Sequence, residues 1–383
     1  MSRGQFIALL IAALMAISAA VVLSTQRNAP DEVHGLPLLP SLASELNTVT
    51  WLSVLKGSAT PSVTVHKQGD AWTVAQRANY PADVPKLRKL LVALSDAKIR
   101  EEKTSDPANY SIIGVEDPTK AGATGAQIEL NAKTGKLDVI VGKPAEQGSF
   151  VRRAGEKSSY VVEPAISFEA EPRYWIDTRL FDISADKIQS IQFKPDTGPA
   201  YTVRRVTEPA PKPVEDKKSA SNATRAAPAA PAPATPAAPA PPAPSKFVLE
   251  GVPSGRQAAD SNDLAPSPST FSSLNDDDVA PVGDIDFSKP WTVTITLSDG
   301  SLMTLTGAAV GDKRWIQVAA PKDASLSAKT AGRAFEIANY RYDQIFKPLE
   351  QLLVPKPAPA KPAAPGAKSL LPSAKKPAAA PKP

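Results

Sequence analysis

The chain has 383 residues and a formal net charge of +5, with 44 Lys and Arg residues against 39 Asp and Glu residues. It contains no cysteine, which excludes a disulfide framework, a thiolate zinc site and a cysteine nucleophile. The net charge is too small and too dispersed to indicate nucleic-acid binding.

The first predicted element is a membrane anchor within residues 1–25. The run from Phe6 to Leu23 has no charge and no proline, and as a helix it would be roughly 27 Å long, close to the thickness of the bilayer hydrocarbon. A cleaved signal peptide is the alternative, with a weak cleavage site at Ser18-Ala19-Ala20, but the apolar run continues through that site. We therefore expect a single-pass protein of the inner membrane whose bulk lies in the periplasm.

Residues 26–41 would form a juxtamembrane stalk, and residues 42–186 a first folded unit. Short runs of alternating apolar and polar residues predict its strands, and leucines at helical spacing behind Pro81 predict a helix over Ala82–Ala97. An aromatic segment from Tyr174 to Phe181 closes the unit. The predicted strands are Thr48–Leu55, Val63–Lys67, Trp72–Gln76, Gln127–Asn131, Leu137–Val141, Ser149–Arg153 and Ser159–Val162.

A second unit is predicted over residues 187–354. It repeats the order of strand meander, short helical segment (Ser267–Leu274), hairpin, strand and aromatic closing segment (Tyr340–Phe346), which indicates an internal repeat. The fold class expected is α+β: two similar repeats of antiparallel sheet, each with a helix packed on one face. The predicted strands are Lys187–Lys194, Tyr201–Val206, Lys246–Leu249, Thr292–Leu297, Leu302–Leu305 and Trp315–Val318.

Two segments rich in Pro and Ala are predicted to be disordered, because they bury too little apolar surface to offset the entropy of ordering. One, residues 208–245, would be a linker inserted in a hairpin loop of the second repeat, where length is tolerated. The other, residues 355–383, is a tail with six lysines and no acid. The tail is either a solvated extension or a weak contact with an anionic envelope surface.

The sequence nominates no catalytic, cofactor-binding or metal-binding residue. His34 and His66 have no triad or metal-ligand spacing around them. Glu101-Glu102 and Asp276-Asp277-Asp278 are acidic enough for a hard cation, but a solvated loop or charged strand edge is the favoured interpretation.

The aromatic closing segments carry the only candidate partner-contact residues, since aromatic side chains supply much of the binding energy at interfaces. The alternative is that these side chains anchor the closing segments to the sheets. The four candidates are Tyr174, Trp175, Tyr340 and Tyr342.

Several motifs of the first unit resemble those of a bacterial family known as domain of unknown function 4340. The resemblance is best over the first unit and weak over the second. Its motifs are Tyr80-Pro81-Ala82-Asp83, Tyr110 to Pro118 (YSIIGVEDP), Val141-Gly142-Lys143, Gly148 to Arg153 (GSFVRR) and Tyr174-Trp175-Ile176-Asp177. Members are single-span membrane proteins with an exported domain, associated with ABC transport systems of the gliding-motility type. The resemblance therefore implies a transporter-accessory role and brings no catalytic residues with it.

Together these observations predict a non-enzymatic, membrane-anchored periplasmic interaction protein. Its partners would be proteins of an ABC-type transporter or of a cell-envelope assembly, and no cofactor is expected. The alternative is an envelope hydrolase or carbohydrate-binding protein that uses paired carboxylates, which would need two acids converging in a cleft.

Overall fold

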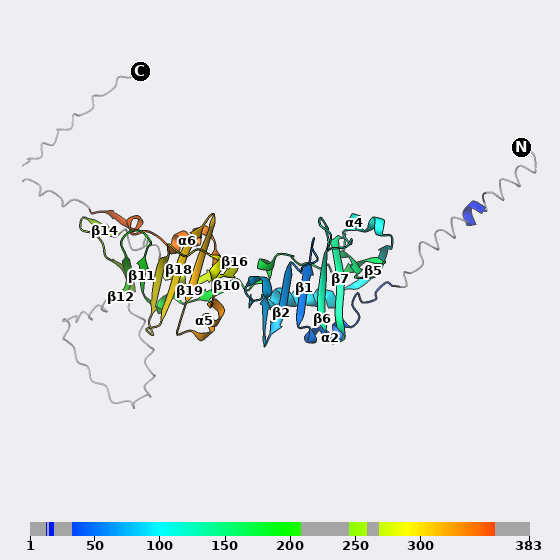
Figure 1. Ribbon diagram of the computed structural model, residues 1–383, viewed down its shortest axis with the longest axis horizontal. Coiled ribbons are helices and arrows are strands. Elements are labelled where there is room, and N and C mark those ends of the chain that lie inside the picture. The colour runs from blue at the N-terminus through cyan, green and yellow to red at the C-terminus, as the bar shows by residue number, and fades with distance from the viewer. Residues whose placement is uncertain (1–12, 14, 19–32, 208–244, 259–267, 357–383) are drawn as a thin grey trace, which may run out of the picture.

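The computed structural model describes residues 13, 15–18, 33–207, 245–258 and 268–356. No helix among them is both long enough and apolar enough to cross a membrane. The expected anchor at Phe6–Leu23 lies largely outside the described residues, and so do most of the linker and the tail. The described part forms two lobes arranged end to end, residues 33–177 and residues 178–356 (Figure 1).

The first lobe is built on an antiparallel sheet of nine strands in the order β4-β3-β2-β1-β6-β7-β8-β9-β5. The strands are β1 (Trp51–Leu55), β2 (Val63–Gln68), β3 (Ala71–Val74), β4 (Tyr80–Pro81), β5 (Lys98–Thr104), β6 (Ala126–Ala132), β7 (Gly135–Pro144), β8 (Ser149–Arg153) and β9 (Ser159–Glu163). The short helices α2 (Leu42–Glu45) and α4 (Tyr110–Ile113) flank it, together with the 3-10 turns η1 (Leu46–Thr48) and η4 (Pro172–Trp175).

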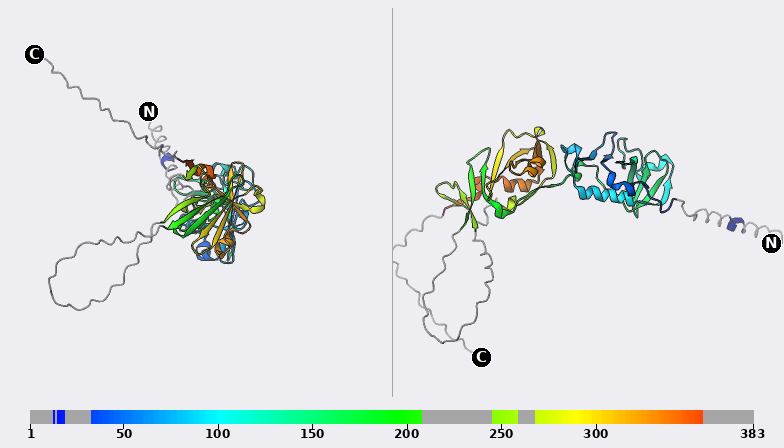
Figure 2. Two further views of the ribbon diagram at one scale, coloured as in Figure 1. Left: turned by 90° about the vertical axis from the view of Figure 1, so that its left-hand side faces the viewer. Right: turned by 90° about the horizontal axis from the view of Figure 1, so that it is seen from below.

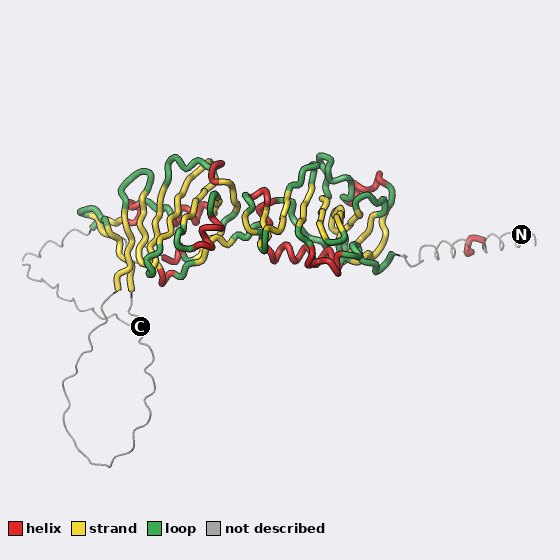
Figure 3. The backbone as a smooth tube through the Cα atoms, turned by 60° about the horizontal axis from the view of Figure 1, so that its bottom comes forward, coloured by secondary structure: helices red, strands yellow, loops and turns green. Residues whose placement is uncertain are grey.

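The main helix of this lobe, α3 (Val84–Asp96), packs on one face of the sheet and is seen as the long helix in Figure 3. Its buried residues, Leu87, Leu90, Leu91 and Leu94, recur at the spacing that places them on one side of a helix. Asp83 caps the first turn by accepting a hydrogen bond from the backbone N–H of Lys86 at 3.1 Å. The sequence prediction of this helix is confirmed.

The second lobe contains an antiparallel sheet of eight strands in the order β13-β12-β11-β17-β18-β19-β20-β16. Two pairs of short strands lie beside it, β10 with β15 and β14 with β21. The helices are α5 (Ala324–Thr330) and α6 (Asn339–Ile345). The strands are β10 (Arg179–Asp182), β11 (Ile188–Lys194), β12 (Tyr201–Thr207), β13 (Ser245–Glu250), β14 (Arg256–Ala258), β15 (Ser273–Asn275), β16 (Asp278–Pro281), β17 (Trp291–Leu297), β18 (Leu302–Val310), β19 (Lys313–Ala319), β20 (Arg333–Ile337) and β21 (Leu353–Pro355).

The eight strands of the second sheet follow the same spatial order as eight strands of the first. The run β3-β2-β1-β6-β7-β8-β9-β5 in the first lobe corresponds position by position to β13-β12-β11-β17-β18-β19-β20-β16 in the second. The mostly antiparallel α+β architecture expected from the sequence is therefore present. The predicted helical segment Ser267–Leu274 is different: its described part forms the 3-10 turn η6 (Pro268–Phe271) followed by strand β15.

A continuous set of buried apolar contacts runs through both lobes and across the junction between them. At the junction, the rings of Tyr80 from β4 and Phe335 from β20 meet edge to face, with their centroids 5.5 Å apart. The lobes are thus packed against each other and not merely joined by the chain.

Candidate functional site

Two of the sequence motifs pair with each other and form the first lobe's side of the junction. The backbone N–H of Asp83 donates to the carbonyl of Trp175 at 2.7 Å, and the N–H of Asp177 donates to the carbonyl of Pro81 at 2.9 Å. Tyr80–Asp83 and Tyr174–Asp177 therefore form one short antiparallel ladder, although about 90 residues separate them in the chain.

The four aromatic candidates are divided between core and surface. Trp175 is only 1 % exposed and its indole N–H donates to the carbonyl of Glu169 at 2.8 Å. Tyr342 of α6 is buried against Phe346, with ring centroids 4.4 Å apart. Both side chains anchor their segments, which corrects their assignment as partner-contact residues. Tyr174 is half-buried under the ammonium group of Lys86, and Tyr340 is 66 % exposed.

The Asp276-Asp277-Asp278 triplet lies at the junction, and its first member is buried. Asp276 is 1 % exposed, and neither of its carboxylate oxygens has a hydrogen-bond partner in the described structure. Burial raises the pKa of Asp276 to about 8, and the charges of Asp177 and Asp277 act in the same direction, against the lowering effects of its own backbone N–H and of Lys329. The interpretation of this triplet as a solvated loop is therefore wrong for Asp276.

Charged side chains bridge the two lobes around this buried acid. Arg77 of the first lobe forms a two-pronged ion pair with Asp278, in which Nη2 lies 3.1 Å from Oδ2. From the second lobe, Arg333 donates through Nη2 to the carbonyl of Ala78 at 2.9 Å, and Lys329 donates to Asp177 at 2.9 Å. These contacts fix the relative position of the lobes.

Asp276 lines neither the two hollows beside the junction nor the two along α3 that are described below. An acid with a raised pKa is a candidate for proton transfer only if it can reach a substrate. The geometry therefore favours a structural role for Asp276 at the junction over the paired-carboxylate chemistry considered from the sequence.

The remaining motifs hold a long loop against the first sheet. A Cβ atom on Gly142 of β7 would lie 2.3 Å from the carbonyl oxygen of Ile113, so the end of α4 can approach this strand only because residue 142 is a glycine. Lys143 donates to the carbonyl of Ile112 at 2.9 Å, and Arg152 donates to the carbonyl of Val115 at 2.9 Å. These motif residues shape the lobe.

The other candidates from the sequence lie at the surface of the first lobe. His34 contacts the carbonyl of Arg100 at 2.6 Å, and His66 lies 3.3 Å from the hydroxyl of Thr73. Glu101 and Glu102 are exposed on the edge strand β5. Within the described ranges, no group of three or more His, Cys, Asp or Glu side chains is placed to hold a metal ion.

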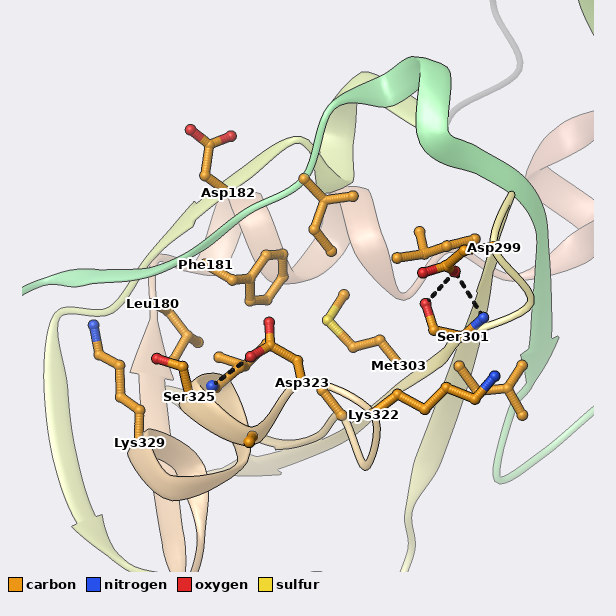
Figure 4. A pocket seen from close by; sticks show the side chains of 16 residues that line it. Leu180, Phe181, Asp182, Asp299, Ser301, Met303, Lys322, Asp323, Ser325 and Lys329 are labelled. Atoms are coloured by element: carbon orange, nitrogen blue, oxygen red, sulfur yellow. Dashed lines mark hydrogen bonds between the residues drawn. The ribbon is translucent and has the colours of Figure 1, made fainter.

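A pocket of about 540 Å³ lies in the second lobe, next to the junction (Figure 4). We call it the α5 pocket, because it is bounded by α5, by β10 and by the turn between β17 and β18. Apolar side chains form much of its lining: Leu180, Phe181, Leu297, Met303, Ala320 and Leu326.

Several of the polar groups at the rim of the α5 pocket have structural partners. Asp323 caps α5 by accepting from the N–H of Leu326 at 2.9 Å, and Lys322 donates to the carbonyl of Gly300 at 3.2 Å. Asp299 accepts from the N–H of Ser301 at 2.8 Å, and the hydrogen bonds from Ser301 lower the pKa of Asp299. Lys329 is held by Asp177 across the junction. The pocket thus combines an apolar floor with a fixed polar rim.

On the other side of β10, a junction groove of about 860 Å³ opens between the lobes. The start of α3 and the motif residue Asp177 line it, and Asp182 belongs both to this groove and to the α5 pocket. Neither hollow was found from the sequence, because each is assembled from segments that lie far apart in the chain.

Comparison with known protein families gives a match that covers less than half of the chain. Residues 72–230 match the model of the family described as Domain of unknown function (DUF4340). The match supports the DUF4340 family and includes the motif residues of the junction. No curated protein and no solved structure gives a significant match.

Proposed function

We propose that this protein is a membrane-anchored periplasmic interaction protein that binds a partner without catalysing a reaction. The observation that carries the proposal is the α5 pocket, whose rim groups Asp299, Lys322 and Asp323 already bond within the fold. The apolar lining between these fixed groups suits an apolar group of a partner.

We further propose that the partner belongs to an ABC-type transporter or to a cell-envelope assembly. This choice rests on the resemblance of the motifs, together with the family match over residues 72–230. The anchor predicted at Phe6–Leu23 would keep both lobes close to such a membrane complex.

We also infer that the two lobes are versions of one repeating unit. The identical order of eight strands in the two sheets supports this inference. On this view, the Pro/Ala-rich segment is an insertion between β12, which ends at Thr207, and β13, which begins at Ser245.

Co-purification tests the proposed function. Leu302 lines the α5 pocket and is exposed, so Leu302→Asp should leave the core intact while it places a charge at the binding surface. Val310 is an exposed residue at the other end of the same strand, which makes Val310→Asp the matched control. From solubilised membranes, the unmodified chain and V310D should recover a transporter or envelope-assembly subunit, and L302D should recover much less. Equal recovery by all three, or recovery of no such subunit, would contradict the proposal.

A further inference from the structure

The outer side of α3 is a second surface, separate from the α5 pocket. Val84, Arg88 and Val92 follow one another at intervals of four residues, so they line one stripe of the helix. Val84 and Val92 are each 39 % exposed. In the right-hand view of Figure 2, α3 lies along the outside of the first lobe. The stripe takes no part in the packing of α3 on the sheet.

The stripe is hollowed into a groove, which we call the α3 groove. Two hollows of about 460 and 380 Å³ adjoin along the helix and share Val84, Arg88 and Val92. In the smaller hollow, the wall opposite α3 is made by Leu46 and by the half-buried ring of Trp72, whereas the larger hollow is lined by α3 alone. Between α3 and Trp72, apolar surface is therefore presented in a concave form, as in sites that receive a helix.

The charges of the α3 groove all have the same sign. Lys67, Arg88 and Lys89 line it, and no Asp or Glu does. None of these three cations forms a side-chain hydrogen bond or an ion pair among the described residues. Elsewhere in the same lobe, cations such as Lys86 and Lys136 are paired with acids.

We propose that the α3 groove binds an acidic amphipathic helix of a partner protein. Apolar side chains of that helix would enter between Val84, Val92 and Trp72, and its carboxylates would pair with Lys67, Arg88 and Lys89. Such complementarity speeds association and selects against basic partners. A protein segment fits better than a membrane surface, because the apolar residues line a concave groove, whereas a bilayer meets a flat or convex face.

The test is selection of binders from a random peptide library displayed on phage, against the full-length protein. The test variant is Arg88→Glu with Lys89→Glu. The control, Lys56→Glu with Lys157→Glu, makes the same change in net charge at two exposed lysines outside the groove. Thermal unfolding of both variants verifies that the fold is retained, and Val92→Ser removes apolar surface while keeping the charges.

We expect the selected peptides to be rich in Asp and Glu, with apolar residues three or four positions apart. Their affinity should fall at least tenfold in R88E/K89E, fall less in V92S, and stay within twofold in K56E/K157E. Selected peptides without acidic enrichment, or with equal affinity for R88E/K89E, would overturn the proposal. Binding of vesicles containing phosphatidylglycerol that is lost in R88E/K89E, without acidic peptides being selected, would assign the groove to the membrane instead.

Discussion

The two lobes order their strands alike but cover their sheets differently. In the first lobe, the 13-residue helix α3 lies on the sheet and buries four leucines. In the second lobe, the 7-residue helix α6 is followed directly by Phe346, whose ring packs on Gly307 of β18. A Cβ atom on residue 307 would lie only 2.6 Å from the ring of Phe346. A sheet needs its apolar face buried, and different elements can do so. Strand order and covering layer are thus separable features of this fold.

The largest effect is expected where the core crosses between the lobes. Trp175→Ala removes a buried ring and leaves the carbonyl of Glu169 without its donor, so we expect a loss of about 3–5 kcal/mol in the free energy of unfolding. Because the apolar contacts are continuous, both lobes should unfold together in one transition, which denaturation followed by fluorescence and circular dichroism can check. Tyr340→Ala, at an exposed ring, is the control. Two separate transitions would show that the lobes are independent.

A pair of glycine substitutions compares two close approaches to the sheets, that of the end of α4 to β7 in the first lobe and that of Phe346 to β18 in the second. Gly142→Ala would bring a Cβ to 2.3 Å from a backbone oxygen, which cannot move aside, whereas in Gly307→Ala the obstacle is the ring of Phe346, which can shift. We expect losses of about 3 and about 1 kcal/mol, measured by urea denaturation. The reverse order would mean that the ring of Phe346 yields less than the backbone at Ile113.

The junction should make stability depend on pH through Asp276. The folded carboxyl keeps its proton up to about pH 8, because its folded pKa is raised by burial, while the unfolded chain releases it near pH 4. Protonation therefore stabilises the folded state in acid, and this contribution is lost as the pH rises toward 8.

We expect the decline to total about 3–4 kcal/mol between pH 5 and pH 8, close to the limit of about 1.4 kcal/mol per pH unit. Asp276→Asn, which mimics the neutral acid, should remove the decline and stabilise the protein at pH 8. Denaturation at several pH values checks this, with Asp182→Asn as the control. An unchanged pH profile in D276N would contradict the burial of this carboxyl.

The smallest effects are expected at the helix caps. Asp83 caps α3 and Asp323 caps α5 through equivalent hydrogen bonds to the N–H three residues later. Replacing either residue by Ala should lower the free energy of unfolding by about 1 kcal/mol, which thermal unfolding can measure. A much larger loss for D83A would show that the contact of Asp83 with Lys86 also matters for the junction.

Local patterns in the sequence predicted the strands with alternating residues and the helix α3. They missed β5, because this edge strand buries only Ile99 and so shows no alternation. The burial of Asp276 also could not be predicted, since its segment bonds to Thr178 and Glu336, which lie far from it in the chain. Three adjacent acids indicate a solvated loop unless the tertiary contacts are known. The α5 pocket was missed for the same reason.

Site-specific photocrosslinking tests the central claim most directly. Benzoylphenylalanine at position 302 would place the crosslinker at the α5 pocket, and at position 310 it would lie at the far end of β18 as the matched control. In native membranes, we predict a crosslink from position 302, but not from position 310, to a subunit of an ABC-type transporter or envelope assembly. Equal crosslinking from both positions, or none from position 302, would contradict the claim that the α5 pocket is the partner-binding site.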